Sequence, residues 1–400
     1  MRKVKLSTCG NYVLSSKIST NNLTPENYIT TDNMLPDKAG IIYSENIPKN
    51  TRVTQFLKDD ILLSNIRPYF KKIWLAEYTG GCSADVLVFR TNDKYDPKYI
   101  KYCLSQDAFF AYDMAGSKGS KMPRGDKNHI LNFELLDYDI ATQKNIGNLL
   151  LSIDNKIKIN NKINTELEKF AKILYEYWFI QFDFPDEFGR PYKSSGGAMV
   201  YNKELKREIP IGWKVKSLYE IAYYTNGLAC QNYRPVDENF YNVIKIKEMH
   251  EGFSTDTEQT RIDIPEKYIV ENGDILFSWS ATLEIQQWVG GKGVLNQHIF
   301  KVTSEKYPKS FYYFKIKDYI RIFKRIAETR KTTMGHITIE HLKQAKVVVP
   351  PIDLVIKLDK KIRFIFNLIQ NNREECQNLT KLREFLLPML MNGQVSIIAE

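Results

Sequence analysis

The sequence predicts an α+β protein built by internal duplication, with two similar mixed α/β domains that are each followed by a long helix of the coiled-coil type. Three observations predict this fold. Short segments of the first half recur in the second at a nearly constant spacing, each half ends in a heptad pattern, and 400 residues are more than one ordinary domain needs. We expect domains at residues 1–141 and 213–350, spacer helices at 142–180 and 351–392, and a connector at 181–212.

The recurring segments keep the same order in both halves. Asp60–Ser64 resembles Asp274–Ser278, and each is an apolar run after a turn, which is typical of a buried strand. Two further matches are Cys82–Val88 with Leu295–Lys301, and His129 with His341. The spacing is 214, 213 and 212 residues in turn, so the halves are expected to be copies of one domain.

The segments from Gln143 to Phe179 and from Asp353 to Met391 predict the two helices, because apolar residues recur every 3.5 positions as in left-handed coiled coils. The a positions are Ile146, Ile153, Asn160, Leu167 and Leu174 in the first, and Leu358, Ile365, Asn372, Leu379 and Leu386 in the second. The d positions include Ile163, Phe170 and Leu368. Asn160 and Asn372 at a positions are expected to set the register of the pair, or else to be solvated in an imperfect seam.

The two helices are also expected to differ in length by one heptad. Asp154 matches Asp359 at a spacing of 205 residues, whereas Leu167 matches Leu379 at 212. A gain of seven residues in the second helix leaves its seam in phase.

Basic residues favour an anionic partner such as nucleic acid, since 57 Lys and Arg outweigh 47 Asp and Glu. Basic segments with hydroxyl groups lie at matching places in the two copies. The candidate DNA-binding residues are Lys118, Ser120, Lys121, Arg124 and Lys127 in the first copy, and Arg330, Lys331 and Thr332 in the second. Lys and Arg neutralise phosphates, and Ser and Thr donate to phosphates or base edges. A solvated charged loop is the alternative.

A second set of candidates follows the repeated strand. Arg67 and Lys71 come after Ser64, and Ser280 and Thr282 come after Ser278. Different chemistry at matching places suits two copies that read different DNA sequences, and unrelated loops are the alternative.

Catalytic motifs are largely absent. The sequence has no ATP-binding G-x-x-x-x-G-K-[ST] loop, no H-E-x-x-H metal motif and no G-x-S-x-G nucleophile turn. The nearest match is Asp186 with Glu204 and Lys206, a two-carboxylate-plus-lysine pattern that suits a metal-dependent nuclease. Both parts fall in the Gly- and Pro-rich connector, so a binding protein is the better interpretation.

No stretch of about eighteen apolar residues and no apolar leader occurs, so we expect no membrane span and no secretory signal. The five cysteines are scattered, which argues against a disulfide framework and for the cytoplasm.

The chain resembles the DNA-specificity (S) subunits of type I restriction–modification enzymes. The resemblance covers essentially the whole chain and rests on LYEYWFIQFDFPDEFGRPYKSSGG (174–197), ELKREIPIGW (204–213), LTKLREFLLPMLMNGQV (379–395) and the paired D-I-L-x-S strands. One departure is that the first copy lacks the P-x-G-W sequence found at Pro210–Trp213.

The resemblance implies two target-recognition domains that each read half of a bipartite site in double-stranded DNA, separated by two long antiparallel helices. It implies a non-catalytic subunit without cofactors, which docks on methyltransferase (M) subunits that bind S-adenosylmethionine and works with restriction/motor (R) subunits that use ATP and Mg²⁺. A stand-alone nuclease and a coiled-coil scaffold without DNA binding are the alternatives.

Overall fold

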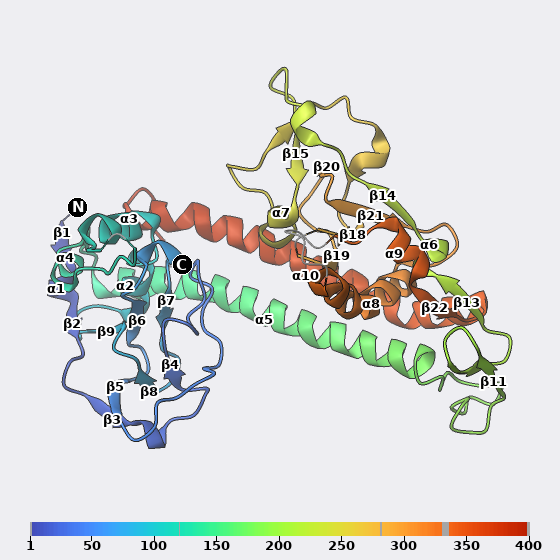
Figure 1. Ribbon diagram of the computed structural model, residues 1–400. Coiled ribbons are helices and arrows are strands. Elements are labelled where there is room, and N and C mark those ends of the chain that lie inside the picture. Colours follow the sequence, from blue (N-terminus) through green and yellow to red (C-terminus); the bar gives the residue numbers. More distant parts are fainter. Residues whose placement is uncertain (1, 120, 281, 330–335, 398–400) are drawn as a thin grey trace. The chain divides into compact units, whose positions relative to one another are not determined.

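The computed structural model describes residues 2–119, 121–280, 282–329 and 336–397 (Figure 1). The chain divides into two compact units. Unit 1 comprises Met1–Lys156 with Leu379–Glu400, and unit 2 comprises Ile157–Asn378. Each unit therefore contains a part of both long helices.

Unit 1 contains two four-stranded sheets and a two-stranded one. The strands are β1 (Lys3–Lys5), β2 (Gly10–Tyr12), β3 (Lys17–Ser19), β4 (Tyr28–Ile29), β5 (Arg52–Phe56), β6 (Ile61–Ser64), β7 (Ile73–Leu75), β8 (Gly80–Cys82), β9 (Val86–Thr91) and β10 (Glu134–Leu136). The short helices are α1 (Leu6–Cys9), α2 (Pro97–Cys103), α3 (Asp107–Gly116) and α4 (Lys127–Leu131). The sheets have the orders β2-β9-β6-β7, β3-β5-β8-β4 and β1-β10.

The repeated strand β6 has an apolar sequence because both of its faces are buried. Ile61 and Leu63 of β6 point into a core shared with α2 and α3, whereas Leu62 points into a core that includes Phe56 and Cys82 of the other sheet. Successive side chains of a strand face opposite ways, so a strand between two cores needs apolar residues at every position. Figure 1 shows the first sheet between the second sheet and helix α2.

Unit 2 repeats this arrangement. Its strands are β13 (Lys214–Ser217), β14 (Tyr223–Asn226), β15 (Tyr241–Ile244), β16 (Gln259–Thr260), β17 (Ile269–Val270), β18 (Ile275–Ser278), β19 (Glu284–Gln287), β20 (Gly293–Leu295), β21 (Ile299–Thr303) and β22 (Lys346–Val349). Its helices are α6 (Leu218–Ile221), α7 (Ile246–Glu251), α8 (Lys309–Thr329) and α9 (Ile339–Gln344). The sheets have the orders β14-β21-β18-β19, β16-β15-β20-β17 and β13-β22.

The strand pairings confirm the predicted duplication. Each first sheet is wholly antiparallel, and each second sheet contains one parallel pair, β4 with β8 and β15 with β20. The copies differ at the edge of this sheet, where β3 joins β5 in unit 1 and β16 joins β15 in unit 2.

The two long helices are α5 (Ile140–Phe179) and α10 (Ile352–Met391), and both have 40 residues. Each is about 60 Å long at 1.5 Å per residue. The first residues of the two helices are 212 positions apart in the sequence, and so are their last residues. The expected gain of seven residues in the second helix is therefore wrong. Asp154 binds Lys101, whereas Asp359 accepts from Ser310, so their match at 205 residues does not reflect equivalent places.

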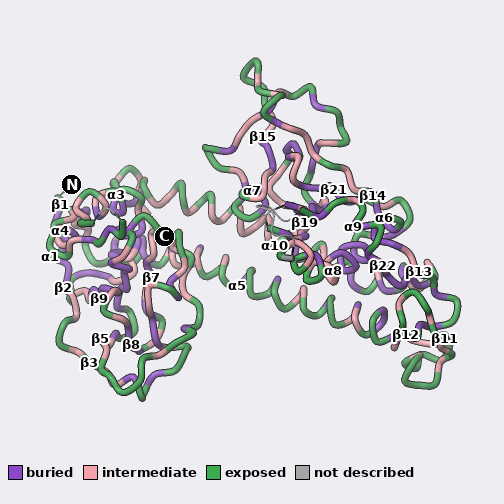
Figure 2. Tube along the Cα trace, viewed as in Figure 1, coloured by how far each residue is buried: buried purple, intermediate pink, exposed green. Residues whose placement is uncertain are grey.

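In unit 2 the helices α5 and α10 pack against each other through residues at a and e positions. The residues at these positions are buried or half-buried, namely Asn160, Asn164, Leu167, Ala171, Leu174 and Trp178 in α5, and Val355, Leu358, Ile362, Ile365, Ile369 and Asn372 in α10. The predicted d residues Ile163, Phe170 and Leu368 are 42%, 53% and 41% exposed. The a residues named here are buried or half-buried, whereas the other residues of the stripe lie four positions later rather than three, and Figure 2 shows much of α5 exposed.

The asparagines form a polar layer in the unit 2 part of this pair, although not with each other. Asn160 donates to Glu375 Oε2 at 2.7 Å, and Asn372 donates to Asn164 Oδ1 at 2.9 Å. The residue numbers rise along one helix and fall along the other, so the helices run antiparallel. Polar residues in such a layer favour one register, because a shift would leave them buried without partners.

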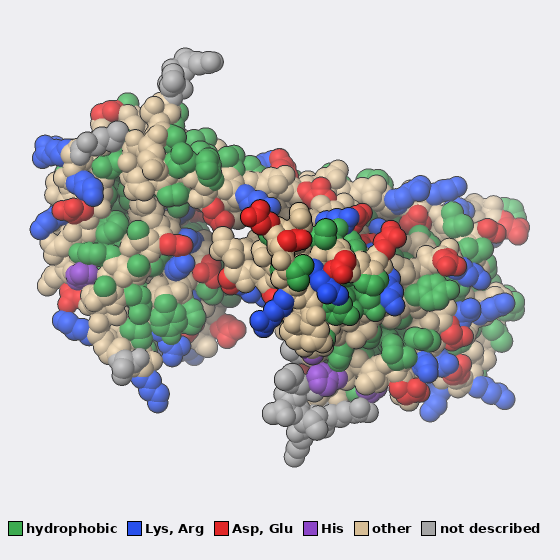
Figure 3. Space-filling model, turned by 90° about the horizontal axis from the view of Figure 1, so that it is seen from above, with side chains coloured by type: hydrophobic (Ala, Val, Ile, Leu, Met, Phe, Trp, Pro, Cys, Tyr) green, Lys and Arg blue, Asp and Glu red, His purple; other side chains and the backbone are tan. Residues whose placement is uncertain are grey.

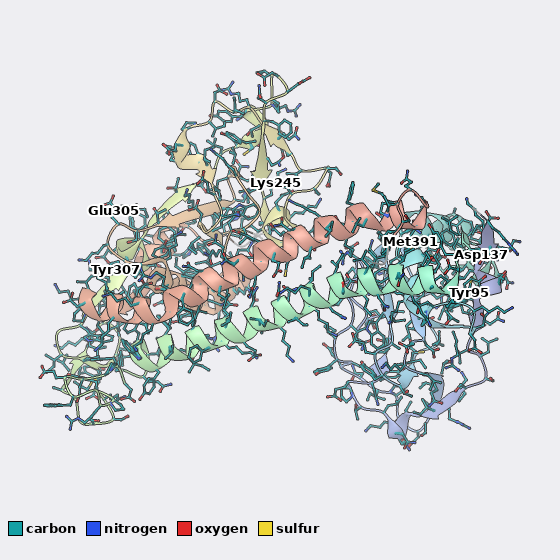
Figure 4. The ribbon with its side chains drawn as sticks, turned by 180° about the vertical axis from the view of Figure 1, so that it is seen from behind. Tyr95, Asp137, Lys245, Glu305, Tyr307 and Met391 are labelled. Atoms are coloured by element: carbon teal, nitrogen blue, oxygen red, sulfur yellow. The ribbon has the colours of Figure 1, made fainter. Side chains whose placement is uncertain are left out.

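In unit 1 the remaining parts of the helices are joined through Asp154. This carboxylate lies 3.2 Å from Lys101 Nζ of α2 and 2.8 Å from Arg383 Nη1 of α10, and it accepts from the Tyr102 hydroxyl at 2.6 Å. Its pKa is lowered by these partners in spite of burial. Met391 lies in the same core as α2, and Figure 4 shows it in unit 1 with Tyr95 and Asp137, which share a 3.0 Å hydrogen bond.

The connector folds around aromatic side chains. Phe182, Phe184 and Trp213 are buried, and Phe184 stacks on Tyr192 with ring centroids 4.6 Å apart. The strands β11 (Met199–Asn202) and β12 (Arg207–Pro210) form an antiparallel pair within it. The connector is therefore a structured part of unit 2 rather than a bare linker.

The adjacent residues Leu368 and Ile369 test the corrected seam. Ile369→Ala is expected to lower the free energy of unfolding by about 2–5 kcal/mol, because the side chain is 6% exposed and a cavity would remain. Leu368→Ala, at a side chain that is 41% exposed, should cost less than about 1 kcal/mol. Urea denaturation of the full chain measures both, and equal losses of stability would contradict the a/e seam.

Candidate nucleic-acid interface

The first and last residues of the D-I-L-x-S motif are structural in both copies. Asp60 accepts two hydrogen bonds of 2.7 Å from Arg90, and Asp274 lies 2.8 Å from Lys301 Nζ. The hydroxyl of Ser64 donates to the carbonyl of Ile66, and that of Ser278 donates to the carbonyl of Ser280. These serines fix the direction in which the chain leaves the strand.

In unit 1 this exit brings together the two sets of predicted DNA-binding residues. Ile66 forms a β-bridge with Arg124, the amide of Arg67 donates to the carbonyl of Pro123 at 2.8 Å, and the amide of Gly125 donates to the carbonyl of Asn65 at 3.1 Å. Residues 65–71, 117–119 and 121–127 therefore form one surface, which we call the unit 1 loop surface.

The predicted basic residues on this surface are exposed or half-buried. Arg67, Lys118, Lys121, Arg124 and Lys127 are exposed, and Lys71 is half-buried beside Asp107 at 2.9 Å. Two of the exposed cations also have acidic partners, since Lys118 lies 2.8 Å from Asp126 and Arg124 lies 3.1 Å from Asp85. Ser120 lies outside the described residues.

The shape of the surface depends on unusual backbone positions. Arg67 and Lys71 have φ angles of 50° and 51° and flank a short 3-10 helix, Pro68–Phe70. Left-handed residues reverse the chain sharply at a steric cost that tertiary contacts must offset. Arg67 and Tyr69 are thereby left exposed to solvent.

A buried acid lies beneath this surface. Burial raises the pKa of Asp113 to about 6. A Cβ atom at Gly125 would lie 2.5 Å from Asp113 Oδ1, so a larger residue there would have to displace the carboxylate. The next residue, Asp126, caps α4 by accepting from two backbone amides, and its ion pair with Lys118 helps to lower its pKa to about 2.

Unit 2 has the same connection at the matching place. Ser280 forms a β-bridge with His336, and the amide of Ile337 donates to the carbonyl of Trp279 at 3.0 Å. The candidates Arg330, Lys331 and Thr332 lie outside the described residues. Thr282 is exposed. Ser280 was expected to bind DNA, but its side chain is 3% exposed because it lies inside this bridge, so it is not available for contact.

Two histidines and a tryptophan meet at this place in unit 2, and sequence reasoning missed this grouping. The Trp279 ring lies 5.6 Å from His298 and 5.5 Å from His336 between centroids, and its Nε1 donates to Asn226 Oδ1 at 3.0 Å. His298 immediately precedes β21, and His336 lies far along the chain. The spacings of 213 and 212 residues already align His298 with Asp85 and His336 with Arg124, but the sequence does not show that the two places lie together.

The residues of the suggested nuclease site have other partners. Asp186 accepts two hydrogen bonds from the Arg190 guanidinium at 3.0 and 3.1 Å and two from backbone amides of its own turn. Glu204 lies 3.5 Å from Lys346, and Lys206 occupies a left-handed turn position. Among the described residues, no group of three or more His, Cys, Asp or Glu could hold a metal ion.

Charge alone does not locate an interface. Lys and Arg side chains are interspersed with Asp and Glu on the face seen in Figure 3. In the part of the chain that the structure describes, no helix is long and apolar enough to cross a membrane.

Comparison with known proteins shows which proteins this chain resembles. Residues 210–382 match the family described as the type I restriction modification DNA specificity domain. The chain is 24% identical over 308 residues to the type I restriction enzyme MjaIX specificity subunit of Methanocaldococcus jannaschii, covering 75% of this chain and 69% of the relative. It is 22% identical over 402 residues to the HindI specificity subunit of Haemophilus influenzae, covering 84% and 87%.

A solved structure has the same fold. The crystal structure of the type I restriction–modification S subunit from M. genitalium superimposes with a TM-score of 0.60 at 14% identity, covering 98% of this chain and 96% of that one. The two mixed α/β units and the two long helices thus form a fold that is also found in that S subunit. Residues 210–382 thus match a DNA specificity domain of type I restriction–modification systems, and the chain is similar over most of its length to specificity subunits of type I restriction enzymes.

Proposed function

We propose that this chain recognises a bipartite target in double-stranded DNA, with one half-site read by each α/β unit, and directs the methyltransferase and restriction subunits of a type I complex to it. One observation carries the proposal. Both units bring a strand exit and a distant loop together through the same β-bridge, but with different side chains, Arg124 in one and His336 in the other. A common frame with different contact groups suits two readers of different sequences.

The chemistry of DNA modification and cleavage would lie in the partner subunits. We propose that the methyltransferase (M) subunits bind S-adenosylmethionine and that the restriction/motor (R) subunits use ATP and Mg²⁺. The nuclease alternative finds no support in Asp186, whose carboxylate is held by Arg190. The other alternative, a scaffold without DNA binding, predicts that the chain binds no DNA duplex.

The basic residues of the unit 1 loop surface are expected to neutralise phosphates. Changing Lys118, Lys121 and Lys127 to Ala should weaken binding to any duplex and reduce the slope of log K against log salt by about 0.9 for each phosphate that is no longer neutralised. Titrations of duplex DNA at several salt concentrations measure this slope. The control replaces the exposed connector residues Lys193, Lys203 and Lys206, which changes the charge equally. A slope that falls equally in both variants would remove the loop from the interface.

We propose that exposed apolar residues of the long helices are the docking surface for the methyltransferase subunits. In α5 these residues are Ile159, Ile163, Phe170, Ile173 and Tyr177, and in α10 they are Phe364, Leu368, Leu382 and Phe385. All occupy d and g positions, a stripe distinct from the a and e seam. Exposed apolar stripes of this kind mark interaction sites in soluble proteins.

Phe170 and Ile173 are 53% and 61% exposed and test this docking surface. Changing both to Ser should weaken binding of the methyltransferase subunits about tenfold or more while leaving the free energy of unfolding nearly unchanged. Affinity can be measured by calorimetry with purified subunits. Tyr201 and Ile211 of the connector are both 60% exposed, and their double Ser variant is the control. Weaker binding in the control alone would move the docking site to the connector.

We further propose that the helices set the distance between the half-sites. Seven residues inserted after Asn161 and seven after Arg373 should keep both seams in phase and lengthen each helix by about 10 Å, or about three base pairs. Mapping of methylated sites should then show a wider gap with the same bases in each half. Four inserted residues would rotate the seam and impair assembly. An unchanged gap in the seven-residue variant would mean that the helices do not set the spacing.

A further inference from the structure

The position of Arg124 in unit 1 is fixed at both its backbone and its side chain. Its amide donates to the carbonyl of Lys118 and its carbonyl accepts from the amide of Lys118, both at 2.9 Å. Its Nη2 lies 3.1 Å from Asp85 Oδ1. The side chain is nevertheless 55% exposed, so the rest of its guanidinium faces solvent.

The place of Asp85 has a direct counterpart in unit 2. Asp85 is the third residue of a tight turn in which the amide of Val86 donates to the carbonyl of Ser83, and its own carbonyl accepts from the amide of Asn65. His298 is the third residue of the turn in which the amide of Ile299 donates to the carbonyl of Asn296. The carbonyl of His298 likewise accepts from the amide of Trp279.

The two units thus hold a pair of side chains at the same two places. The pair is Arg124 with Asp85 in unit 1 and His336 with His298 in unit 2. The two units share the backbone contacts at these places, but the side chains there differ in chemistry. Side chains that differ on a common backbone frame are those expected to determine sequence preference.

We propose that Arg124 reads a guanine in the half-site bound by unit 1, and that Asp85 is the positioning residue that holds its guanidinium for this contact. This inference rests on the proposed function. A guanidinium has five donors in a planar fork, and a carboxylate that accepts one of them orients the others. Guanine offers two acceptors, N7 and O6, on its major-groove edge, whereas adenine places an amino group beside its N7.

The other cations of this surface fit that role less well. Lys118 and Lys121 carry compact ammonium groups, which suit phosphates but cannot form the planar two-bond contact. Within the described part of the chain, Arg67 has no carboxylate that orients it as Asp85 orients Arg124. Arg124 is therefore the specificity-determining residue, and the lysines add affinity that does not depend on sequence.

The test uses the full chain assembled with its methyltransferase subunits and a plasmid library with randomised half-sites. Arg124→Lys keeps the charge but removes the fork, and Asp85→Asn keeps the shape but removes the carboxylate. Arg190→Lys is a matched control, because Arg190 forms a similar exposed pair with Asp186 at 3.0 Å in the connector.

Arg124→Lys is expected to lower the preference for guanine at one position of one half-site by about tenfold to hundredfold, with the other positions unchanged. Asp85→Asn should lower the preference at that same position by a smaller factor, and Arg190→Lys should change no position. Thermal unfolding of each variant verifies that it is folded.

Several results would overturn the inference. If Arg124→Lys lowers methylation equally at all sites, or changes none, Arg124 is not a base reader. If Asp85→Asn leaves the guanine preference intact, Asp85 does not position the arginine. If the wild-type complex methylates without any fixed sequence, the proposed function itself fails, which is a separate outcome from loss of one base preference.

Discussion

The antiparallel pairing of α5 and α10 through a and e positions is the constraint on which the rest of the structure depends. In unit 2 it combines apolar residues such as Ile365 with a polar layer in which Asn160 meets Glu375 and Asn372 meets Asn164. Apolar burial supplies the driving force but tolerates shifts along the helix, whereas the polar layer permits one alignment. Asp154 serves a similar purpose in unit 1, because it holds α2 and α10 to α5 at once.

The α/β parts divide structural and recognition roles between neighbouring residues. In the repeated strand, Asp60 and Asp274 bind basic residues of the sheet, and Ser64 and Ser278 bind the backbone just beyond it. The residue that follows each serine differs between the copies, Asn65 in one and Trp279 in the other. Because the frame is made by the same contacts in both copies, the exposed residues are free to differ without loss of the fold.

Much of the fold was predictable, since the strands from Ile61 and Ile275 and both long helices have strong periodic signals. The seam was only half predicted. Phe170 and Ile163 are as apolar as core residues. Periodicity cannot distinguish an apolar stripe that faces a second helix from one that faces solvent. The residues that complete the seam include the small Ala171 and the polar Asn164, which carry no apolar signal. The site was harder to predict, because His298 and His336 reach Trp279 only through the pairing of β18 with β21 and the bridge at Ser280.

The division of the helices between the units has a consequence for biosynthesis. Unit 2 is continuous in the chain, from Ile157 to Asn378, whereas unit 1 requires the segment from Leu379 onward. Leu390 and Met391 of that segment belong to the same core as Ile146 and Leu150. Chains emerge from the ribosome from their N-terminus, and the first domain made is ordinarily the first to be completed. Here the order is reversed, because the unit that begins the chain waits for its last helical turns while unit 2 already has all of its residues.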